Sequence, residues 1–238
     1  MRFILRCVKM RELLLQPRLQ LLANMVPVGS RLADVGTDHG YVPVWLIQHG
    51  RIASAIASDI GDDPLRHARE TAAEFEVSGI DFRLCAGLDA ITPEETDTIL
   101  IAGMGGETIQ TILSCAPWTA DGEHLLLLQP MTKVELLRKW LSDNRYYFTD
   151  ERLVYDKNHL YPVFAVRGGN RPPITLLQQY GGVMLDGDPL YAAYLDERID
   201  KLQKAIAGMR VSSATTNAVK ADSLTDICRL LEEKRRML

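Results

Sequence analysis

The sequence predicts an α/β protein in which a seven-stranded sheet is followed by an α-helical hairpin that forms a coiled coil. Three observations lead to this prediction. Seven short β-type runs alternate with helical segments between residues 31 and 167. The runs at 97–102 and 124–129 are apolar throughout, which is typical of central parallel strands covered on both faces. Beyond residue 190 the apolar residues recur at the spacing of helices.

The elements are expected in a regular order along the chain. A helix begins at Pro17, a residue suited to a first helical position, and ends before Pro27. Another helix starts at Asp62, which we predict to be its N-cap. The remaining expected elements are strands at 31–35, 53–59, 80–85, 97–102 and 124–129, helices at 40–49, 105–115 and 132–143, and an antiparallel hairpin of 146–154 and 159–167.

A run of glycine and proline at 168–173 marks a boundary, so we expect two domains, 1–168 and 169–238. Two amphipathic helices joined by a polar turn at 211–217 are expected to fold back on each other as an antiparallel hairpin. The apolar positions that predict them are Leu195, Ile199, Leu202, Ile206 and Met209, then Leu224, Ile227, Leu231 and Leu238.

Composition excludes several classes of protein. With 47% hydrophobic and 24% charged residues, the 238-residue chain is typical of a globular protein. Residues 1–22 are apolar but interrupted by charges, which disfavours a signal peptide or a membrane span. The four cysteines show no CxxC spacing, so we predict reduced thiols, no metal site and a cytoplasmic protein.

Charge is unevenly distributed, although the net value is only −4. Residues 1–30 contain five Lys or Arg and one Glu, whereas residues 31–167 contain twelve basic and twenty-one acidic residues. A basic segment from Arg2 to Arg18 and a tail ending in Lys234-Arg235-Arg236 are compatible with a polyanionic partner. Ordinary solvated helix faces are the alternative interpretation.

The segment Asp34-Val35-Gly36-Thr37-Asp38-His39-Gly40-Tyr41 follows the first strand. Glycine in such a turn lets the backbone approach a bound nucleotide-like ligand. Asp59 ends the next strand about 20 positions later, the spacing expected for a carboxylate that accepts from ribose hydroxyls. An ordinary tight turn and a carboxylate at a helix N-terminus are the structural alternatives.

Later strand ends add weaker candidates. Gly87 follows the third strand, and the fourth runs into Ala102-Gly103-Met104-Gly105-Gly106, a glycine-rich turn predicted to open a helix. Ligands bind at this carboxyl edge of parallel sheets. Gln129-Pro130 at the next strand end is a similar candidate, and a flexible glycine loop is the alternative for 103–106.

Four segments, 34–41, 101–106, 128–130 and 137–141, resemble the bacterial TrmK family of tRNA (adenine-N1)-methyltransferases, which act on adenine 22 in the D-loop. The resemblance covers nearly the whole chain, including Arg18-Leu19, Asp150-Glu151 and the helical tail. It implies a Rossmann-like domain that binds S-adenosyl-L-methionine and a tail that helps to hold tRNA. Five strands closed by an antiparallel pair is also the class I methyltransferase order, whereas a dinucleotide-binding Rossmann sheet is normally all parallel.

The resemblance also implies which residues bind the cofactor. These positions are Asp34, Gly36, Thr37, Asp38, His39, Tyr41, Asp59, Ile60, Ala86, Gly87, Leu88, Ala102, Gly103 and Met104. The family usually has an acidic residue at Ala86, an Asn at Met131 and a Glu at Pro162. Adenine recognition through a carboxylate at position 86 is therefore absent from this chain.

We predict that adenine N1 attacks the methyl group in line, without prior loss of a proton. Positive charge then develops on the base, and Asp38 is assigned the catalytic role of stabilising it, because the glycine turn does not require Asp38 for its geometry. His39 is a less favoured candidate as a base. The expected partner is tRNA, without a membrane or a metal, and the oligomeric state, monomer or weak dimer, is left open.

Three other functions are compatible with parts of the sequence. Ala86, Met131 and Pro162 favour an RNA-binding protein that has lost catalysis. A small-molecule methyltransferase is the nearest enzymatic alternative, but it has no need of the helical tail. A nicotinamide-dependent oxidoreductase is disfavoured, because Asp38-His39 stand where GxGxxG has its second glycine and because the sheet closes with a hairpin.

Overall fold

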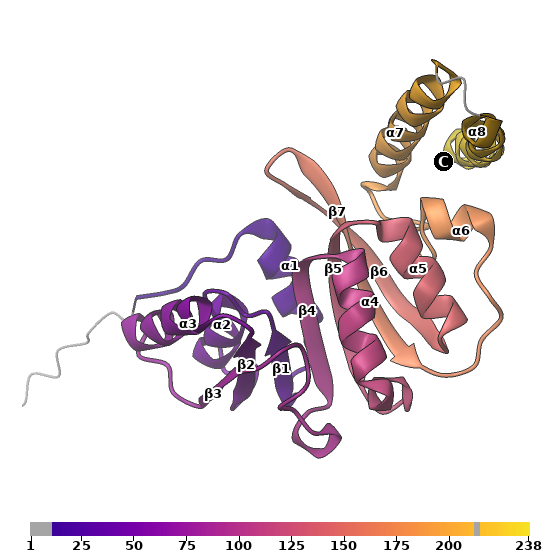
Figure 1. The fold of residues 1–238 in the computed structure, drawn as a ribbon. Helices are drawn as coiled ribbons and strands as arrows, with labels where there is room; N and C mark the ends of the chain where they lie inside the picture. The colour runs from indigo at the N-terminus through magenta and orange to yellow at the C-terminus, as the bar shows by residue number, and fades with distance from the viewer. Residues whose placement is uncertain (1–10, 212–214) are drawn as a thin grey trace, which may run out of the picture. The chain divides into compact units, whose positions relative to one another are not determined.

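A computed structural model describes residues 11–211 and 215–238. Arg2, Arg6 and Lys9 of the predicted basic segment, and residues 212–214 of the predicted turn, lie outside these ranges. The chain forms two compact units, one ending at Leu100 and one beginning at Ile101. The elements are α1 Pro17–Met25, β1 Leu32–Val35, α2 Tyr41–Gln48, β2 Ala55–Asp59, α3 Asp62–Glu74, β3 Ile80–Leu84, η1 Pro93–Glu95, β4 Thr98–Gly105, α4 Gly106–Cys115, η2 Pro117–Ala120, β5 Leu125–Thr132, α5 Val134–Asp143, β6 Tyr146–Asp156, β7 His159–Gly168, α6 Leu176–Gly181, α7 Tyr191–Val211 and α8 Thr215–Arg236 (Figure 1).

The seven strands are hydrogen-bonded in the order β3-β2-β1-β4-β5-β7-β6. β1 pairs with β2, and β2 with β3, in parallel. β7 pairs antiparallel with both β5 and β6. The predicted seven strands and their closing antiparallel pair are confirmed.

The first unit is built on the three parallel strands β1, β2 and β3. All four residues of β1 and the first four of β2 are buried, as expected of strands covered on both faces. Val44 of α2 and Ala72 of α3 pack with Leu13 in one apolar cluster. Helices α2 and α3 follow the strands whose carboxyl ends carry the predicted site.

The N-cap of α3 differs from the prediction. The helix begins at Asp62, but its N-cap is Gly61, whose backbone is extended and whose N–H donates to Asp59 Oδ1 at 2.9 Å. A Cβ on Gly61 would lie 3.0 Å from the Pro64 ring, which explains glycine at this position. Asp62 is therefore in the first helical turn, where its charge is favourable to the helix dipole.

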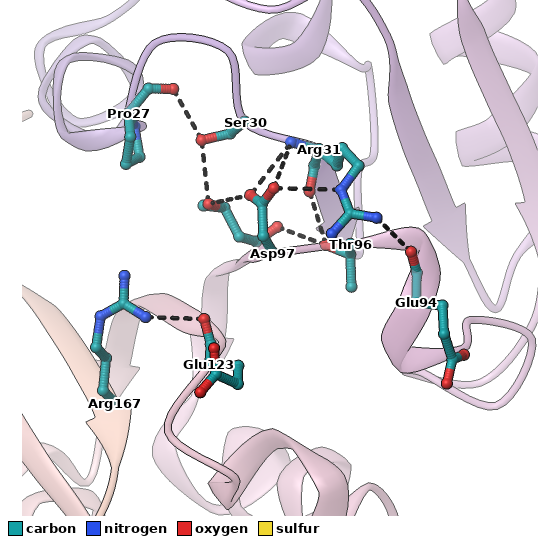
Figure 2. Close-up of polar contacts among 9 residues, drawn as sticks. Pro27, Ser30, Arg31, Glu94, Thr96, Asp97, Glu123 and Arg167 are labelled. Carbon is teal, nitrogen blue, oxygen red and sulfur yellow. Dashed lines mark hydrogen bonds and ion pairs between the residues drawn. The ribbon is translucent and has the colours of Figure 1, made fainter.

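Hydrogen bonds hold the amino end of β1 in place, at the opposite end of the strand from the predicted site (Figure 2). The Asp97 carboxylate accepts from the backbone N–H of Arg31 at 3.2 Å and from its Nε at 3.3 Å. Thr96 Oγ1 donates to the Arg31 carbonyl at 2.8 Å, and Arg31 Nη1 donates to the Glu94 carbonyl. In the second unit, Arg167 Nη1 donates to the Glu123 carbonyl at 2.8 Å. These contacts stabilise the fold and are not part of the predicted site.

Two strands are longer than predicted. β4 continues to Gly105 and β5 to Thr132, so that Gln129-Pro130 lies within a strand rather than at its end. The glycines of 103–106 indicated a turn, but Gly105 has the extended angles φ −66° and ψ 147°. The helix that follows begins at Gly106. The glycine-rich stretch is therefore a strand end that leads directly into α4.

The predicted β-hairpin is confirmed, with a shorter turn than expected. β6 and β7 pair from Tyr146 with Gly168 to Asp156 with His159, so that only Lys157 and Asn158 connect them. Both residues have positive φ, 46° and 65°. This is the geometry of the two-residue turns that match the twist of a hairpin.

The two long C-terminal helices pack together in antiparallel fashion, as predicted (Figure 1). Arg235 Nε donates to Asp196 Oδ1 at 2.9 Å near one end of the pair, and Arg210 Nη2 donates to Thr225 Oγ1 at 3.2 Å near the other. The predicted apolar positions that are buried between them include Leu195, Leu202, Ile206, Ile227 and Leu231. The prediction is wrong for Leu238, which is 54% exposed because α8 ends at Arg236.

The second unit also contains a buried ion pair that links its layers. Arg138 of α5 and Glu151 of β6 are both fully buried, with Nη2 and Oε1 2.6 Å apart. Arg138 Nη2 donates to Tyr194 Oη of α7 at 3.1 Å, and Glu151 Oε2 accepts from the N–H groups of Val183 and Met184. The base of the helical hairpin is thereby fixed to α5 and β6.

Among the described residues, no helix combines the length and the apolar character that crossing a membrane requires. In the same part of the chain, His, Cys, Asp and Glu side chains do not gather in any group of three or more that could hold a metal ion. Cys85, Cys115 and Cys228 are free thiols, and Cys7 lies outside the described ranges.

Candidate functional site

The predicted residues of the first unit follow three neighbouring parallel strands at their carboxyl ends. The 34–41 loop leaves β1, Asp59 ends β2, and 86–88 follows β3. Asp34 pairs with Ala57 in the sheet register, and Asp59 pairs with Leu84. Because the strands are parallel, these three segments lie at one edge of the sheet.

The turn after β1 is held by hydrogen bonds to β2. The N–H groups of Gly36 and Thr37 donate to the Ser58 carbonyl at 2.8 and 3.0 Å. Gly36 has φ 72°, a conformation that glycine adopts without strain. Thr37 Oγ1 donates to Asp34 Oδ2 at 2.6 Å, so that Asp34 and Thr37 stabilise the turn from within.

Burial changes the acidity of Asp34. The side chain lies in the sheet, and the residue is only 6% exposed. Desolvation is the largest cause that raises its pKa, the hydrogen bond from Thr37 opposes it, and the charge of Asp59 adds to it, so that the pKa rises from 3.8 to about 6. The two carboxylates therefore interact electrostatically, as expected for groups at neighbouring strand ends.

Asp38 lies on the outer part of the loop, and its side chain is 71% exposed. Its φ is 51°, a left-handed conformation that a non-glycine residue adopts uncommonly. The expectation that the turn does not require Asp38 for its geometry is therefore wrong, because the backbone bends at Asp38 as well as at Gly36. Asparagine and aspartate tolerate this conformation better than most residues.

His39 forms an aromatic stack rather than a catalytic pair with a buried partner. Its ring lies 5.1 Å from the ring of Tyr41 and 5.1 Å from that of His67 on α3. His39 Nε2 is 3.7 Å from Asp38 Oδ1. This arrangement suits a residue that orients the loop. Gly40, with φ 67°, begins α2 so close to α3 that an added Cβ would lie 3.1 Å from that of Ala68.

Asp59 is half-buried at the end of β2 and uses one oxygen locally. Oδ1 accepts from the Gly61 N–H, and the described residues supply no hydrogen-bond partner to Oδ2. Ile60 beside it is 78% exposed, an unusual position for a large apolar side chain. A carboxylate oxygen and an apolar surface are thus presented together at the strand end.

The loop after β3 closes on the other side of Asp59. The Cys85 N–H donates to the Asp59 carbonyl at 2.9 Å, and Ser58 Oγ donates to the Gly87 carbonyl at 3.4 Å. Gly87 has φ 55°, and the Leu88 side chain is buried beneath the loop. Ala86 is exposed and carries no group that could accept a hydrogen bond from a ligand.

The second unit contains the other predicted residues, Ala102, Gly103 and Met104, in the last part of β4. The Gly103 N–H donates to Gln129 Oε1 at 3.1 Å, and Gly103 has φ 77°. Gln129 is fully buried and also donates from Nε2 to the Pro130 carbonyl. The weak candidate Gln129 therefore supports the strand end from behind, while Ala102 and Met104 are half-buried.

Glycine at the start of α4 allows a close approach to the end of β5. A Cβ on Gly106 would lie 2.7 Å from the Lys133 carbonyl oxygen and 2.9 Å from that of Thr132. A Cβ on Gly105 would lie 3.2 Å from Thr132 Oγ1. The glycine-rich sequence is thus required by packing within this unit.

Sequence reasoning missed two contributors to the site. Ser58 anchors both the first turn and the third loop, and its identity as a small polar residue one position before Asp59 was the available signal. His67 reaches the loop from the second turn of α3, and nothing in the local sequence indicated this, because the contact depends on how α3 packs.

A parallel sheet closed by an antiparallel hairpin, with a carboxylate at the end of β2 and glycine turns after β1 and β3, defines a class I methyltransferase. Residues 15–164 match the family described as "Methyltransferase domain". The chain is 33% identical to the tRNA (adenine(22)-N(1))-methyltransferase of Bacillus subtilis over 190 residues, 78% of this chain and 76% of that protein. It belongs to this family of methyltransferases, TrmK.

Two solved structures support the assignment along nearly the whole chain. The crystal structure of the B. subtilis M1A22 tRNA methyltransferase TrmK has a TM-score of 0.83 and 29% identity, with 93% of this chain and 99% of that chain covered. A Streptococcus pneumoniae protein described as a putative tRNA (m1A22) methyltransferase, in complex with S-adenosyl-L-methionine, has a TM-score of 0.78 and 28% identity, covering 91% and 97%.

Proposed function

We propose that this chain transfers a methyl group from S-adenosyl-L-methionine to N1 of adenine 22 in the D-loop of tRNA. The observation that carries the proposal is the 33% identity to the B. subtilis enzyme of that name, which extends over 78% of the chain. The strand order supports it over an oxidoreductase, because a dinucleotide-binding sheet is normally all parallel.

The residues of the first unit fit the cofactor. Asp59 Oδ2 is available to accept from the ribose hydroxyls, and charge-assisted hydrogen bonds of this kind are strong. The exposed side chain of Ile60 can pack against the face of the adenine ring. Gly36 and Gly87 have no side chains, so the cofactor can approach the backbone closely at these two bends. These residues, with Asp34, Thr37, His39, Tyr41, Ala86 and Leu88 around them, are the proposed cofactor positions; Ala102, Gly103 and Met104 stay predictions for the second unit.

When bound, the cofactor supplies a methyl group on a positively charged sulfur. The chain's own residues need not remove a proton first, because N1 of adenine has a free lone pair. Correct alignment of two bound partners can contribute on the order of 7–11 kcal/mol to the lowering of the barrier. The task of the protein is therefore mainly to position the base and to stabilise the charge it acquires.

Asp38 is the proposed residue for charge stabilisation. Its carboxylate is exposed, unlike that of Asp34, so a substrate can reach it. The backbone bend at Asp38, with φ 51°, sets the direction in which its side chain leaves the loop. A carboxylate near the developing positive charge of the methylated base lowers the energy of the transition state.

The helical hairpin is proposed to hold the tRNA. A small substrate would need no such element, and the end of α8 carries Lys234, Arg235 and Arg236. Contacts to phosphates release counterions, so binding is expected to weaken as salt concentration rises. The target adenine has to leave its stack to react, as in other enzymes that act on bases. This function also supports the proposal of a cytoplasmic protein.

The direct test is methylation of unmodified bacterial tRNA with labelled S-adenosyl-L-methionine, followed by nucleoside analysis. We expect 1-methyladenosine, and its loss when adenine 22 is replaced by guanine. Calorimetry with the cofactor runs in parallel. A chain that binds tRNA but gives no heat with the cofactor and no 1-methyladenosine would be an RNA-binding protein without catalysis.

A further inference from the structure

The second unit contains a cavity of about 400 Å³ at the end of β5. It extends between the start of α5, the beginning of β7 and the first half of α7. This volume falls within the range of roughly 300–1,000 Å³ that small-ligand sites occupy. Its charged lining side chains are Lys133, Glu197, Arg198 and Lys201, and Met131, Tyr161 and Tyr194 are among the other lining residues.

Positive charge dominates the lining. Arg198 Nη2 pairs with Glu135 Oε2 at 2.8 Å, and Lys201 Nζ is 3.8 Å from Glu197 Oε2, at the outer limit of an ion pair. Lys133 has no ion-pair partner among the described residues. Lys133 is exposed, and the side chain of Lys201 is 64% exposed, so both lysines are available to an anion.

Lys133 occupies a costly backbone position. It is the N-cap of α5 with φ 55° and ψ 37°, a left-handed conformation that glycine or asparagine adopts more easily. Its side chain does not cap the helix, so the first N–H groups of α5 also lack a side-chain acceptor there. The chain therefore carries a charged side chain where the backbone conformation alone favours glycine or asparagine.

Aromatic and sulfur-containing side chains also line the cavity. Tyr194 is buried, and its hydroxyl accepts from Arg138 Nη2 at 3.1 Å. Tyr161 lies half-buried on β7, and Met131 is 40% exposed at the end of β5. Aromatic rings and methionine form the flat, polarisable surface on which a nucleobase stacks.

Two residues that line the cavity also pack against the start of α4. Thr132 and Lys133, which line it, are the residues whose carbonyl oxygens crowd the Cα of Gly106. Basic residues continue along α7 beyond it at Lys204, one turn past Lys201.

We propose that this cavity is an RNA subsite for one nucleotide of the bound tRNA. Lys133 and Lys201 hold a backbone phosphate of that nucleotide, and its base lies against Tyr161 and Met131. The inference rests on the proposed function, since it concerns how the same substrate is held. It assigns RNA contacts to the end of β5 and the base of α7, in addition to the C-terminal end of α8.

The test measures binding of an unmodified tRNA transcript by fluorescence anisotropy at several salt concentrations. It compares the full-length wild-type chain with the variants Lys133→Asn, Lys201→Gln, Tyr161→Leu and Lys139→Gln. Asn is chosen at 133 because it tolerates the positive φ. Lys139 is the control, because it lies on the same helix, pairs with Asp143 and does not line the cavity. Circular dichroism and melting temperature check that each variant is folded.

We expect Lys133→Asn and Lys201→Gln each to reduce the slope of log K against log salt by about 0.7–0.9, the value for one lost phosphate contact. Tyr161→Leu should weaken binding about tenfold without a change of slope, because it removes stacking and no charge. Lys139→Gln should leave both quantities unchanged.

Two results would overturn the inference. One is an equal loss for Lys139→Gln, which would indicate a general effect of net charge. The other is binding of adenosine monophosphate as tight as that of tRNA and equally sensitive to Lys133→Asn, which would indicate a small-anion site. Failure of wild-type protein to methylate tRNA would contradict the proposed function instead, and the salt slopes would be measured independently of it.

Discussion

Two carboxylates of the loop after β1 lie four residues apart in opposite environments. Asp34 is buried and accepts a hydrogen bond from Thr37, whereas the side chain of Asp38 is 71% exposed. The buried group acts on the shape of the loop, and the exposed one is accessible to a substrate. Their substitution should therefore have different consequences.

Asp38→Asn keeps the size of the side chain and tolerates the positive φ, but removes the charge. We expect kcat for tRNA methylation to fall about 100-fold, within the range found when an electrostatic contact to a transition state is lost. The dissociation constant of S-adenosyl-L-methionine should change less than twofold by calorimetry. Equal losses of cofactor binding and turnover would assign Asp38 to the cofactor.

The raised pKa of Asp34, about 6 against an ordinary 3.8, makes stability depend on pH. Between these values the folded state binds more protons than the unfolded state, so stability falls as pH rises through this window. From pH 5 to 7.5 the loss is about 1 kcal/mol. Urea unfolding of wild type and Asp34→Asn at both pH values, without cofactor, should show this loss in wild type only. A pH-independent difference between the two proteins would contradict it.

At this scale the sequence predicted where the candidate residues of the first unit lie in the sheet, but not their conformations. Gly36 and Asp59 were predicted by spacing, and both lie at one sheet edge. The bend at Asp38 and the stack of His39 on His67 were not predictable. The stack depends on how α3 packs beside the loop, which local sequence does not specify.

At the scale of elements, the strands were predicted by their apolar runs, while their ends were not. Glycine and proline normally punctuate structure, yet Gly105 and Pro130 lie within β4 and β5. The reason is tertiary: Gln129 Oε1 accepts from the Gly103 N–H, and α4 has to begin close against the end of β5. The short helix α6 was missed, although Thr175 and Gln178 form a capping box at its start.

Two glycine substitutions test this explanation with opposite signs. Gly106→Ala places a Cβ 2.7 Å from the Lys133 carbonyl oxygen, and backbone cannot move aside cheaply. We expect the free energy of unfolding to fall by about 1–3 kcal/mol, as for overpacking. Gly208→Ala lies within α7 with nothing within 4 Å of the new Cβ, so it should raise stability by about 0.5–1 kcal/mol. Chemical denaturation measures both, and a neutral Gly106→Ala would show that α4 can shift.

For the whole molecule, the glycine and proline run at 168–173 predicted a domain boundary, but the contacts around it indicate mutual dependence. Leu153 and Leu160 of the hairpin belong to the same apolar cluster as Leu195 and Leu231 of the long helices. Composition could indicate where the chain changes from strands to helices. Composition could not show that the Arg138–Glu151 ion pair would be hydrogen-bonded to Tyr194 on the other side of that boundary. The two paired residues entered the sequence analysis only within segments of the family resemblance.

A chain truncated after Gly168 is therefore expected not to fold stably. Truncation exposes Leu153 and Leu160, each worth roughly 1.5–3 kcal/mol when buried, and removes the hydrogen bonds that Tyr194 and Val183 make with the buried ion pair. The control is a chain truncated after Arg236, which lacks only the exposed Met237 and Leu238. It should have the same melting temperature as the full chain. Solubility and thermal melting of the three proteins measure this. If the 1–168 chain melted cooperatively at the full-length temperature, the helical hairpin would be an independent appendage, and its deletion would become a clean test of tRNA binding.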